Sequence, residues 1–253
     1  MIIRIKELIW SLAVLLCSLI PAVFRRLVCR LVFDVEARRH QPQGLKNLFI
    51  IDDVLRWQID AAATKFEKGI HPKHRLTQYH KYFVDRVRVG ETVLDVGCGY
   101  GDLTDELAAK GAHVTGIDID IRRIEIAKER YSRPNLSFLH GDILTTDLKG
   151  RFDVIVISNV LEHISARIKM LRDLGKVFHP RCFLVRVPML DRHWSVSMRA
   201  ELGLPHFIDP THCTEYTAES FCAEMKGAGL KVVRLSVCWG EIWSEVACIS
   251  ADV

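Results

Sequence analysis

The feature that most constrains this chain is a short apolar run that leads into a glycine-rich turn. The run is Val93–Val96, and Gly97, Gly99 and Gly101 follow it with one residue between each. The apolar residues predict a buried parallel strand, and Leu103–Ala109 predicts the helix after it. Glycines in a strand-to-helix turn let the backbone approach a ligand closely, and the N-terminus of the helix points at that ligand. The segment therefore predicts an α/β fold with a ligand site at its first turn.

The charges around this turn narrow the class of ligand. The fingerprint of dinucleotide-binding proteins is G-x-G-x-x-G, which requires a glycine where this chain has Asp102. Asp102 and Asp95, an acidic residue within the apolar run, make a poor site for a pyrophosphate and a favourable one for a positively charged ligand. S-adenosylmethionine, which has a sulfonium and an α-ammonium group, is such a ligand.

Three further segments follow the glycine turn in a fixed order. Val114–Asp120, Leu136–Asp142 and Phe152–His163 each begin with a strand-like apolar run and end in polar residues. Together with the turn, they make the chain resemble the class I S-adenosylmethionine-dependent methyltransferases. The resemblance implies a doubly wound, seven-stranded sheet of order 3-2-1-4-5-7-6, with the seventh strand antiparallel. Such sheets bind ligands at the carboxyl ends of their strands.

The remainder of the chain fits this alternation of strands and helices. Thr217 is a plausible N-cap for one helix, with Ser220 three residues on and Gly229 as the stop. Helices are predicted at 72–87, 166–177 and 217–228, and strands at 182–187, 231–237 and 244–250.

The resemblance carries cofactor contacts onto particular positions. Asp118 lies 21 residues after Gly97, close to the spacing of about 20 at which an acidic residue reaches the ribose hydroxyls. The third strand of the family ends in a Gly-Asp pair that contacts adenine, which Gly141 and Asp142 match. The expected cofactor-binding residues are Asp95, Gly97, Cys98, Gly99, Gly101, Asp118, Ile119, Asp142, Ile143 and Asn159.

Two histidines are the expected catalytic residues. Methyl transfer from a sulfonium is an in-line displacement that positioning alone accelerates strongly. A general base is needed only if the acceptor is a hydroxyl or a protonated amine. His163 follows the fourth strand and His212 precedes the helix at 217–228, so both are expected at the ligand edge of the sheet. Each has an alternative role as a loop histidine bonded to its surroundings.

No metal is expected at this site. Relatives that methylate quinone precursors carry a glutamate where this chain has Asn159, and with a pair such as Glu162-His163 they resemble a metal site. Asn159 removes that ligand. The eight cysteines are scattered without a C-x-x-C pair or a zinc-ligand spacing, which fits a reducing compartment.

The N-terminal segment differs from the rest of the chain in charge and hydropathy. Residues 1–50 hold eight basic and three acidic residues, whereas the whole chain has a net charge of +4. Leu8–Phe24 is uncharged and mostly apolar, but a helix of this length spans about 25 Å, less than the roughly 30 Å of a bilayer core, and Pro21 interrupts it. We expect contact with a membrane through residues 8–24, as a span or in the interface; the alternative is a helix packed on the domain. The arginines that follow predict a cytoplasmic location at the inner face of the cell membrane.

These observations predict an N-terminal helical segment at 1–44 and a class I methyltransferase domain at 45–253. The expected activity is S-adenosylmethionine-dependent methyl transfer to a small-molecule, lipid or lipid-linked acceptor. A nucleic-acid partner is not expected, because residues 51–253 have a net charge close to zero and lack the Pro-Pro signature of base-amino methyltransferases. Two alternatives are an NAD(P)-dependent oxidoreductase and a non-catalytic adenosylmethionine-binding protein. Asp102 argues against the oxidoreductase, because that class requires glycine at this position. The presence of all the expected cofactor-binding residues argues against a non-catalytic protein.

Overall fold

The computed structural model describes residues 2–68 and 71–249, with side chains from Ile9 onward, and divides into two compact units. The first unit is Met1–Gly69 and the second is Ile70–Val253. The division falls later than the sequence-based boundary after residue 44. The reason is that helix α3 (Gln43–Phe66) is continuous over 24 residues and packs against the helix before it.

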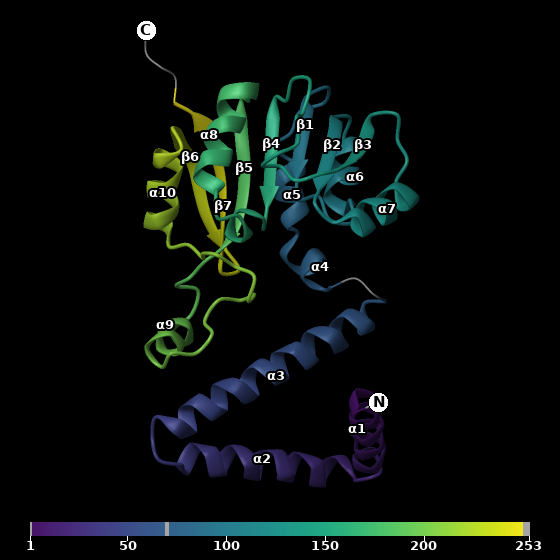
Figure 1. The fold of residues 1–253 in the computed structure, drawn as a ribbon, viewed down its shortest axis with the longest axis vertical. Helices are drawn as coiled ribbons and strands as arrows, with labels where there is room; N and C mark the ends of the chain where they lie inside the picture. Colours follow the sequence, from purple (N-terminus) through teal and green to yellow (C-terminus); the bar gives the residue numbers. More distant parts are fainter. Residues whose placement is uncertain (1, 69–70, 250–253) are drawn as a thin grey trace. The chain divides into compact units, whose positions relative to one another are not determined.

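The first unit consists of three helices, drawn in purple and blue in Figure 1. Helix α1 (Ile2–Ser18) and helix α2 (Ala22–Arg38) are separated by a break at Pro21, where the helix axis turns through 118°. Within the described residues no single helix is both long and apolar enough to cross a bilayer, although α1 and α2 satisfy that test as a bent pair. The break agrees with the interruption that Pro21 predicts.

Helices α2 and α3 meet through a few specific contacts. The Asn47 side chain donates to the Glu36 carboxylate at 2.7 Å, and Glu36 also pairs with Arg39 at 3.3 Å. A Cβ at Gly44 would collide with the Glu36 carbonyl oxygen, so glycine permits the close approach of the two helices.

The second unit is built on a seven-stranded sheet of order β3-β2-β1-β4-β5-β7-β6, as the resemblance implies. β7 runs opposite to the other six strands of this sheet, so the carboxyl ends of those six lie along one edge (Figure 1). The strands are β1 (Thr92–Val96), β2 (His113–Asp118), β3 (Leu136–His140), β4 (Val154–Ser158), β5 (Cys182–Pro188), β6 (Leu230–Cys238) and β7 (Glu241–Cys248).

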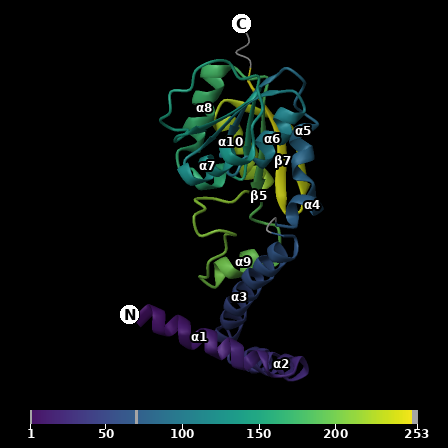
Figure 2. The same cartoon turned by 90° about the vertical axis from the view of Figure 1, so that its right-hand side faces the viewer.

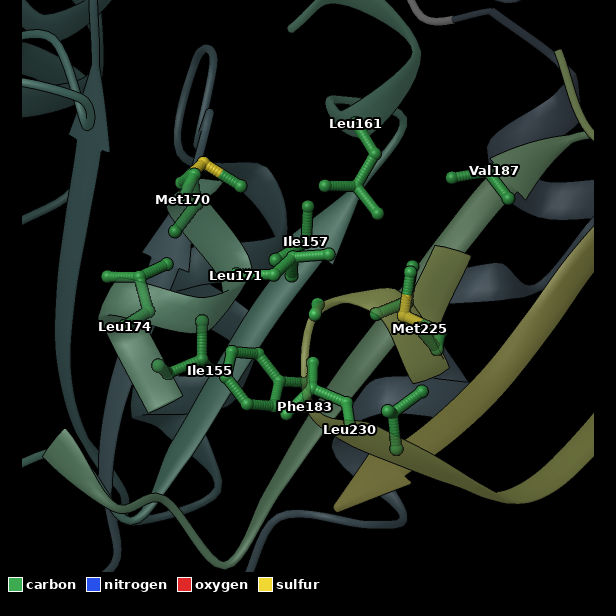
Figure 3. Packing of buried hydrophobic residues seen from close by; sticks show 14 of the residues in the cluster. Ile155, Ile157, Leu161, Met170, Leu171, Leu174, Phe183, Val187, Met225 and Leu230 are labelled. Atoms are coloured by element: carbon green, nitrogen blue, oxygen red, sulfur yellow. The ribbon is translucent and has the colours of Figure 1, made fainter. Parts of the chain in front are cut away.

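Helices cover both faces of this sheet because its strands alternate their apolar side chains between two cores. Ile155 and Ile157 of β4 point to the core beneath α8 and α10, whereas Val154 and Val156 point to the core beneath α5 and α6. Figure 3 shows the first core, where Phe183 of β5 lies beside Ile155. The helices are α4 (Lys73–Thr77), α5 (Tyr79–Val84), α6 (Asp102–Ala109), α7 (Ile121–Arg130), α8 (Arg167–Phe178), α9 (Trp194–Glu201) and α10 (Ala218–Gly227), with a 3₁₀ turn, η1, at Leu161–His163.

Two helix predictions have different outcomes. At α10, the Thr217 hydroxyl accepts from the Ser220 amide and the Ser220 hydroxyl accepts from the Thr217 amide, which confirms Thr217 as the N-cap. The single helix predicted at 72–87 is wrong, because Gln78 has a φ of +49° and separates α4 from α5. Tyr79, directly after the break, is buried in the core, whereas Leu76 before it is 57% exposed.

The segment between β5 and α10 is closed on itself at its two ends. Met189 and Tyr216 form an isolated parallel bridge, and the Leu190 amide donates to the Tyr216 carbonyl at 2.8 Å. We call residues 190–215 the closed loop. It carries α9, and Figures 1 and 2 both show α9 beyond the carboxyl ends of the parallel strands.

Candidate active site

The glycine turn after β1 has the backbone geometry that glycine permits. Gly97, Gly99 and Gly101 have φ values of +68°, +58° and +84°, a region that L-residues with a Cβ rarely adopt. A Cβ at Gly97 would overlap the Val160 side chain, and one at Gly101 would lie 2.7 Å from the Phe138 ring. A Cβ at Gly99 would meet no atom within 4 Å. Gly99 is therefore the turn residue with an open side toward a ligand.

Asp118 ties the end of β2 to this turn. One carboxylate oxygen accepts from the Gly99 amide and the other from the Asp120 amide, both at 2.9 Å. The side chain is buried, yet each oxygen keeps a second lone pair that a ribose hydroxyl can use. The structure thus brings together two of the expected cofactor residues, Asp118 and Gly99.

The two acidic residues of the charge argument have structural partners. Asp95 is buried and accepts from the Thr104 hydroxyl at 2.7 Å, and burial raises its pKa to about 6. Asp102 begins α6 and accepts from the Tyr131 hydroxyl at 2.7 Å. The side chain of Asp95 therefore points toward α6, whereas its backbone forms part of the end of β1 that leads into the glycine turn.

The other expected cofactor residues lie at neighbouring strand ends. Cys98 is buried, which raises the pKa of its thiol, whereas Ile119 after β2 is 69% exposed. Asp142 after β3 accepts from the Leu144 amide at 2.9 Å, and Ile143 beside it is half-buried. Asn159 after β4 has a φ of +54°, and within the described part of the chain its buried Oδ1 has no hydrogen-bond partner. These positions line the carboxyl ends of β1 to β4.

A second group of side chains gathers where β4 ends. Glu162 and His163 of η1 meet His212 of the closed loop, with one ligating atom from each within 4.8 Å of the others. The two imidazole rings lie edge to face with centroids 4.6 Å apart. The loop is fixed there by the Cys213 amide, which donates to the Glu162 carbonyl at 2.7 Å. Both expected catalytic histidines are therefore brought together. We call these three residues the Glu-His-His cluster.

The partners of the two histidines determine which ring nitrogen is free. His163 Nδ1 lies 2.9 Å from the Thr211 hydroxyl, which donates in turn to Asp209 at 2.6 Å. The Thr211 oxygen must then accept, so His163 carries its proton on Nδ1. His212 Nδ1 lies 3.0 Å from the buried Glu215 carboxylate, which also favours a proton on Nδ1. Both Nε2 atoms are left with a lone pair.

Glu162 is the buried member of the cluster. Its side chain is 1% exposed, and its Oε2 has no hydrogen-bond partner among the described residues. Burial raises the pKa of this carboxyl to about 8. A buried carboxyl oxygen without a partner is costly, which indicates that a ligand or cation completes the site.

The Glu-His-His cluster offers side chains that suit a divalent cation, although the sequence analysis expected no metal at this site. Two imidazole Nε2 atoms and one carboxylate oxygen are a common ligand set for first-row transition metals, and His partners such as Glu215 are typical of second-sphere support. The expectation of no metal rested on Asn159 in place of a fourth ligand. The three remaining side chains converge without it.

Three structural residues near this site, Glu215, Arg186 and Glu241, escaped the sequence analysis. Glu215 binds His212, Arg192 and the Ile208 amide from a fully buried position, and Arg186 of β5 pairs with Glu241 of β7. Glu215 follows His212 by only three residues, but it lies in a loop whose sequence has no periodic pattern. No local signal distinguishes it from an exposed glutamate.

Comparison with known proteins decides the family. Residues 69–235, about two thirds of the chain, match the model of a methyltransferase domain family. The chain belongs to the class I S-adenosylmethionine-dependent methyltransferases. This membership removes the oxidoreductase alternative.

Curated relatives of this methyltransferase match part of its length. The ribosomal protein L11 methyltransferase of Thermotoga maritima is 34% identical over 130 residues, which is 50% of this chain and 47% of the relative. The ubiquinone biosynthesis O-methyltransferase of Coxiella burnetii is 35% identical over 105 residues, which is 40% of this chain and 44% of the relative. The chain thus spans about half the length of the curated relatives that it matches.

Solved structures share the fold of this methyltransferase. Magnesium protoporphyrin IX methyltransferase from Synechocystis PCC 6803, with bound S-adenosylhomocysteine, aligns with a TM-score of 0.56 at 19% identity, over 68% of this chain and 83% of that one. Mitomycin 7-O-methyltransferase aligns with a TM-score of 0.56 at 20% identity, over 76% of this chain and 60% of that one.

Proposed function

We propose that this protein transfers the methyl group of S-adenosylmethionine to a hydroxyl oxygen of a small-molecule, lipid or lipid-linked acceptor. The Glu-His-His cluster carries the proposal, because two imidazoles and a carboxyl group converge at the strand end that adjoins the cofactor turn, and the Nδ1 atoms of both rings have partners that leave Nε2 free to accept a proton. A hydroxyl is the acceptor that needs a base or a cation, whereas a neutral amine or carbon nucleophile needs neither. One curated relative is named as an O-methyltransferase, which agrees with this choice.

The proposed mechanism assigns separate tasks to the two groups of residues. Bound S-adenosylmethionine supplies an electrophilic methyl carbon on a sulfonium leaving group. Asp118 and the open side of Gly99 hold the nucleoside part, with the carboxylate directed to the ribose. His163 or His212 accepts the hydroxyl proton on Nε2 while the acceptor oxygen forms its bond to the methyl carbon and the carbon–sulfur bond breaks. If a divalent cation occupies the cluster, Glu162, His163 and His212 hold it, and it lowers the pKa of the bound hydroxyl instead.

Asp118→Ala is expected to weaken S-adenosylmethionine binding by about 1.5–3 kcal/mol, the usual loss for a charged hydrogen-bond partner. Isothermal titration calorimetry measures this as a roughly 10- to 150-fold rise in Kd. Asp120→Ala is the matched control. Its carboxylate caps α7 through the Arg122 amide, so its loss lowers stability with little change in affinity. Equal affinities for wild type and Asp118→Ala would remove Asp118 from the cofactor site.

We further propose that the N-terminal unit keeps the protein at the inner face of the cell membrane. Residues 8–24, the segment expected from the sequence to contact lipid, include many highly exposed apolar side chains, among them Trp10 at 72% and Leu19 at 75%. Large contiguous apolar surfaces of this kind are rare on monomeric soluble proteins.

Deletion of residues 1–68 is expected to leave a folded domain that binds S-adenosylmethionine with an affinity within about twofold of wild type. The physical reason is that, among the residues whose burial the structure describes, the two sheet cores begin at Tyr79. The full-length protein should sediment with membranes and be released by detergent but not by salt. Complete recovery of the full-length protein in the supernatant after lysis would contradict the membrane proposal.

A further inference from the structure

Helix α2 presents two chemically distinct faces, and none of its residues is buried. One face gathers three guanidinium groups over two helical turns. Its six residues line one shallow groove, Ala22, Arg25, Arg26, Cys29, Arg30 and Phe33. At 100° per residue these six fall within an arc of about 140°. We call them the arginine face.

The opposite face of α2 is an exposed apolar stripe. Val23, Leu27, Leu31 and Val35 follow one another at intervals of four residues and are 52–72% exposed. Residues with this spacing lie on one side of a helix. An exposed stripe rimmed by charge marks a surface that binds a membrane or another protein.

The break before α2 is held by a side chain from the arginine face. Arg25 donates to the carbonyl oxygens of Cys17 and Ser18 at 3.4 and 3.2 Å, which satisfies acceptors at the C-terminal end of α1. The axis therefore turns through 118° at a hydrogen-bonded corner, and α2 does not continue the direction of α1.

We propose that α2 lies in the headgroup region of an anionic membrane, with its apolar stripe in the lipid and its arginine face on acidic headgroups. This inference deepens the proposed membrane contact and rests on it. A helix with arginines on one face and Leu and Val on the other is suited to the interface plane. Helix α1 supports lipid as the occupant, because its exposed apolar side chains occur at consecutive positions, Leu15 and Leu16 included, and surround the helix.

The positive charge of the arginine face favours binding to anionic over neutral lipid. Arg26 and Arg30 are exposed, no acidic residue lines their groove among the described residues, and the nearest carboxylate is that of Asp34, which pairs with Arg30 at 3.9 Å. Each arginine held near an anionic surface strengthens partitioning about fivefold. Reversing two charges should therefore weaken partitioning onto anionic vesicles by at least about 30-fold, and by more at low salt.

Vesicle flotation of the full-length protein tests the inference. The vesicles are phosphatidylcholine alone, or phosphatidylcholine with one third phosphatidylglycerol. The test variant is Arg26→Glu with Arg30→Glu, which leaves the corner residue Arg25 intact. The control is Lys128→Glu with Lys231→Glu, an equal change of charge at two exposed positions of the other unit. Circular dichroism and cofactor binding confirm that each variant is folded.

We expect wild type and control to float more strongly with anionic vesicles, and the arginine variant to lose this preference while it still floats with neutral ones. Leu27→Asp with Leu31→Asp should reduce flotation with both. Equal flotation of wild type with the two vesicle types would overturn the inference and leave the membrane contact intact. An arginine variant that behaves like the control would also overturn it. So would a lipid-free oligomer that the leucine variant converts to a monomer, because a second copy would then cover the stripe.

Discussion

Replacing His163 or His212 with alanine is expected to lower turnover by about 10²–10⁴-fold, the usual contribution of a general acid or base. Cofactor affinity should stay within about twofold of wild type, because the hydrogen bonds of the two side chains within the described residues go to Thr211 and Glu215 and not to the glycine turn or Asp118. Single-turnover assays with saturating S-adenosylmethionine and a library of hydroxylated acceptors measure the effect.

The matched control is His193→Ala, which removes a histidine of the same closed loop. His193 caps α9 by accepting from the Ser195 amide and does not belong to the Glu-His-His cluster. Its loss should change turnover by less than about tenfold. Near-normal turnover in both His163→Ala and His212→Ala would mean that the enzyme acts by positioning alone, and that the acceptor is a carbon or nitrogen.

A chelator distinguishes the two ways in which the cluster can work. If it holds a divalent cation, dialysis against EDTA should abolish turnover, and a transition-metal ion should restore it. Direct titration of manganese into wild type and Glu162→Gln gives a readout that does not depend on activity. Unchanged turnover after dialysis assigns the histidines to proton transfer.

Arg186→Met is expected to lower the free energy of unfolding by about 3–5 kcal/mol, the cost of breaking a buried ion pair. Arg186 is 3% exposed on β5, donates twice to Glu241 at 2.6 and 2.7 Å, and donates to the Ser158 hydroxyl at 3.2 Å. Its guanidinium also stacks on the Tyr79 ring, 3.7 Å from the centroid. The methionine variant leaves the Glu241 carboxylate without its charge partner. Urea denaturation of the isolated second unit measures the loss.

Two controls separate the buried pair from a general effect of charge. Arg186→Met with Glu241→Gln should recover much of the loss, because no unpaired charge remains. Lys169→Met breaks the exposed pair with Asp173 and should cost less than about 0.5 kcal/mol. A loss below about 1 kcal/mol in Arg186→Met would show that water reaches Glu241 and replaces the arginine.

The sheet could be predicted because the motifs that mark its strands each lie within a short stretch of the sequence. The apolar run, the glycines and the acid at the end of β2 each occur within a few residues, and they carry the family resemblance that implied the observed strand order. The break at Gln78 could not be predicted, since it depends on Tyr79 reaching Arg186 on a strand that lies a hundred residues later. Tertiary contacts of this kind override helix periodicity.

Part of the candidate site could likewise be predicted from the sequence, and part could not. The backbone turn at Gly99 and the side chain of Asp118 follow from motif spacing, and the structure joins them by a hydrogen bond. The partners that set the histidine tautomers, Thr211 and Glu215, come from an aperiodic loop whose path is fixed only when it closes. Sequence spacing therefore located the histidines but gave no means of assigning the protons on their rings.

The closed loop has a consequence for how such an enzyme can diversify. Its ends are held together by the Met189–Tyr216 bridge, Arg192 bonds within it to Glu215 and to the His206 carbonyl, and its last residues bond to η1 through Thr211 and Cys213. Residues between these anchors can change in length and composition without moving the strands that carry the glycine turn. Related enzymes can therefore differ in their methyl acceptor through changes in the closed loop alone, provided that His212 and Glu215 at its end are retained.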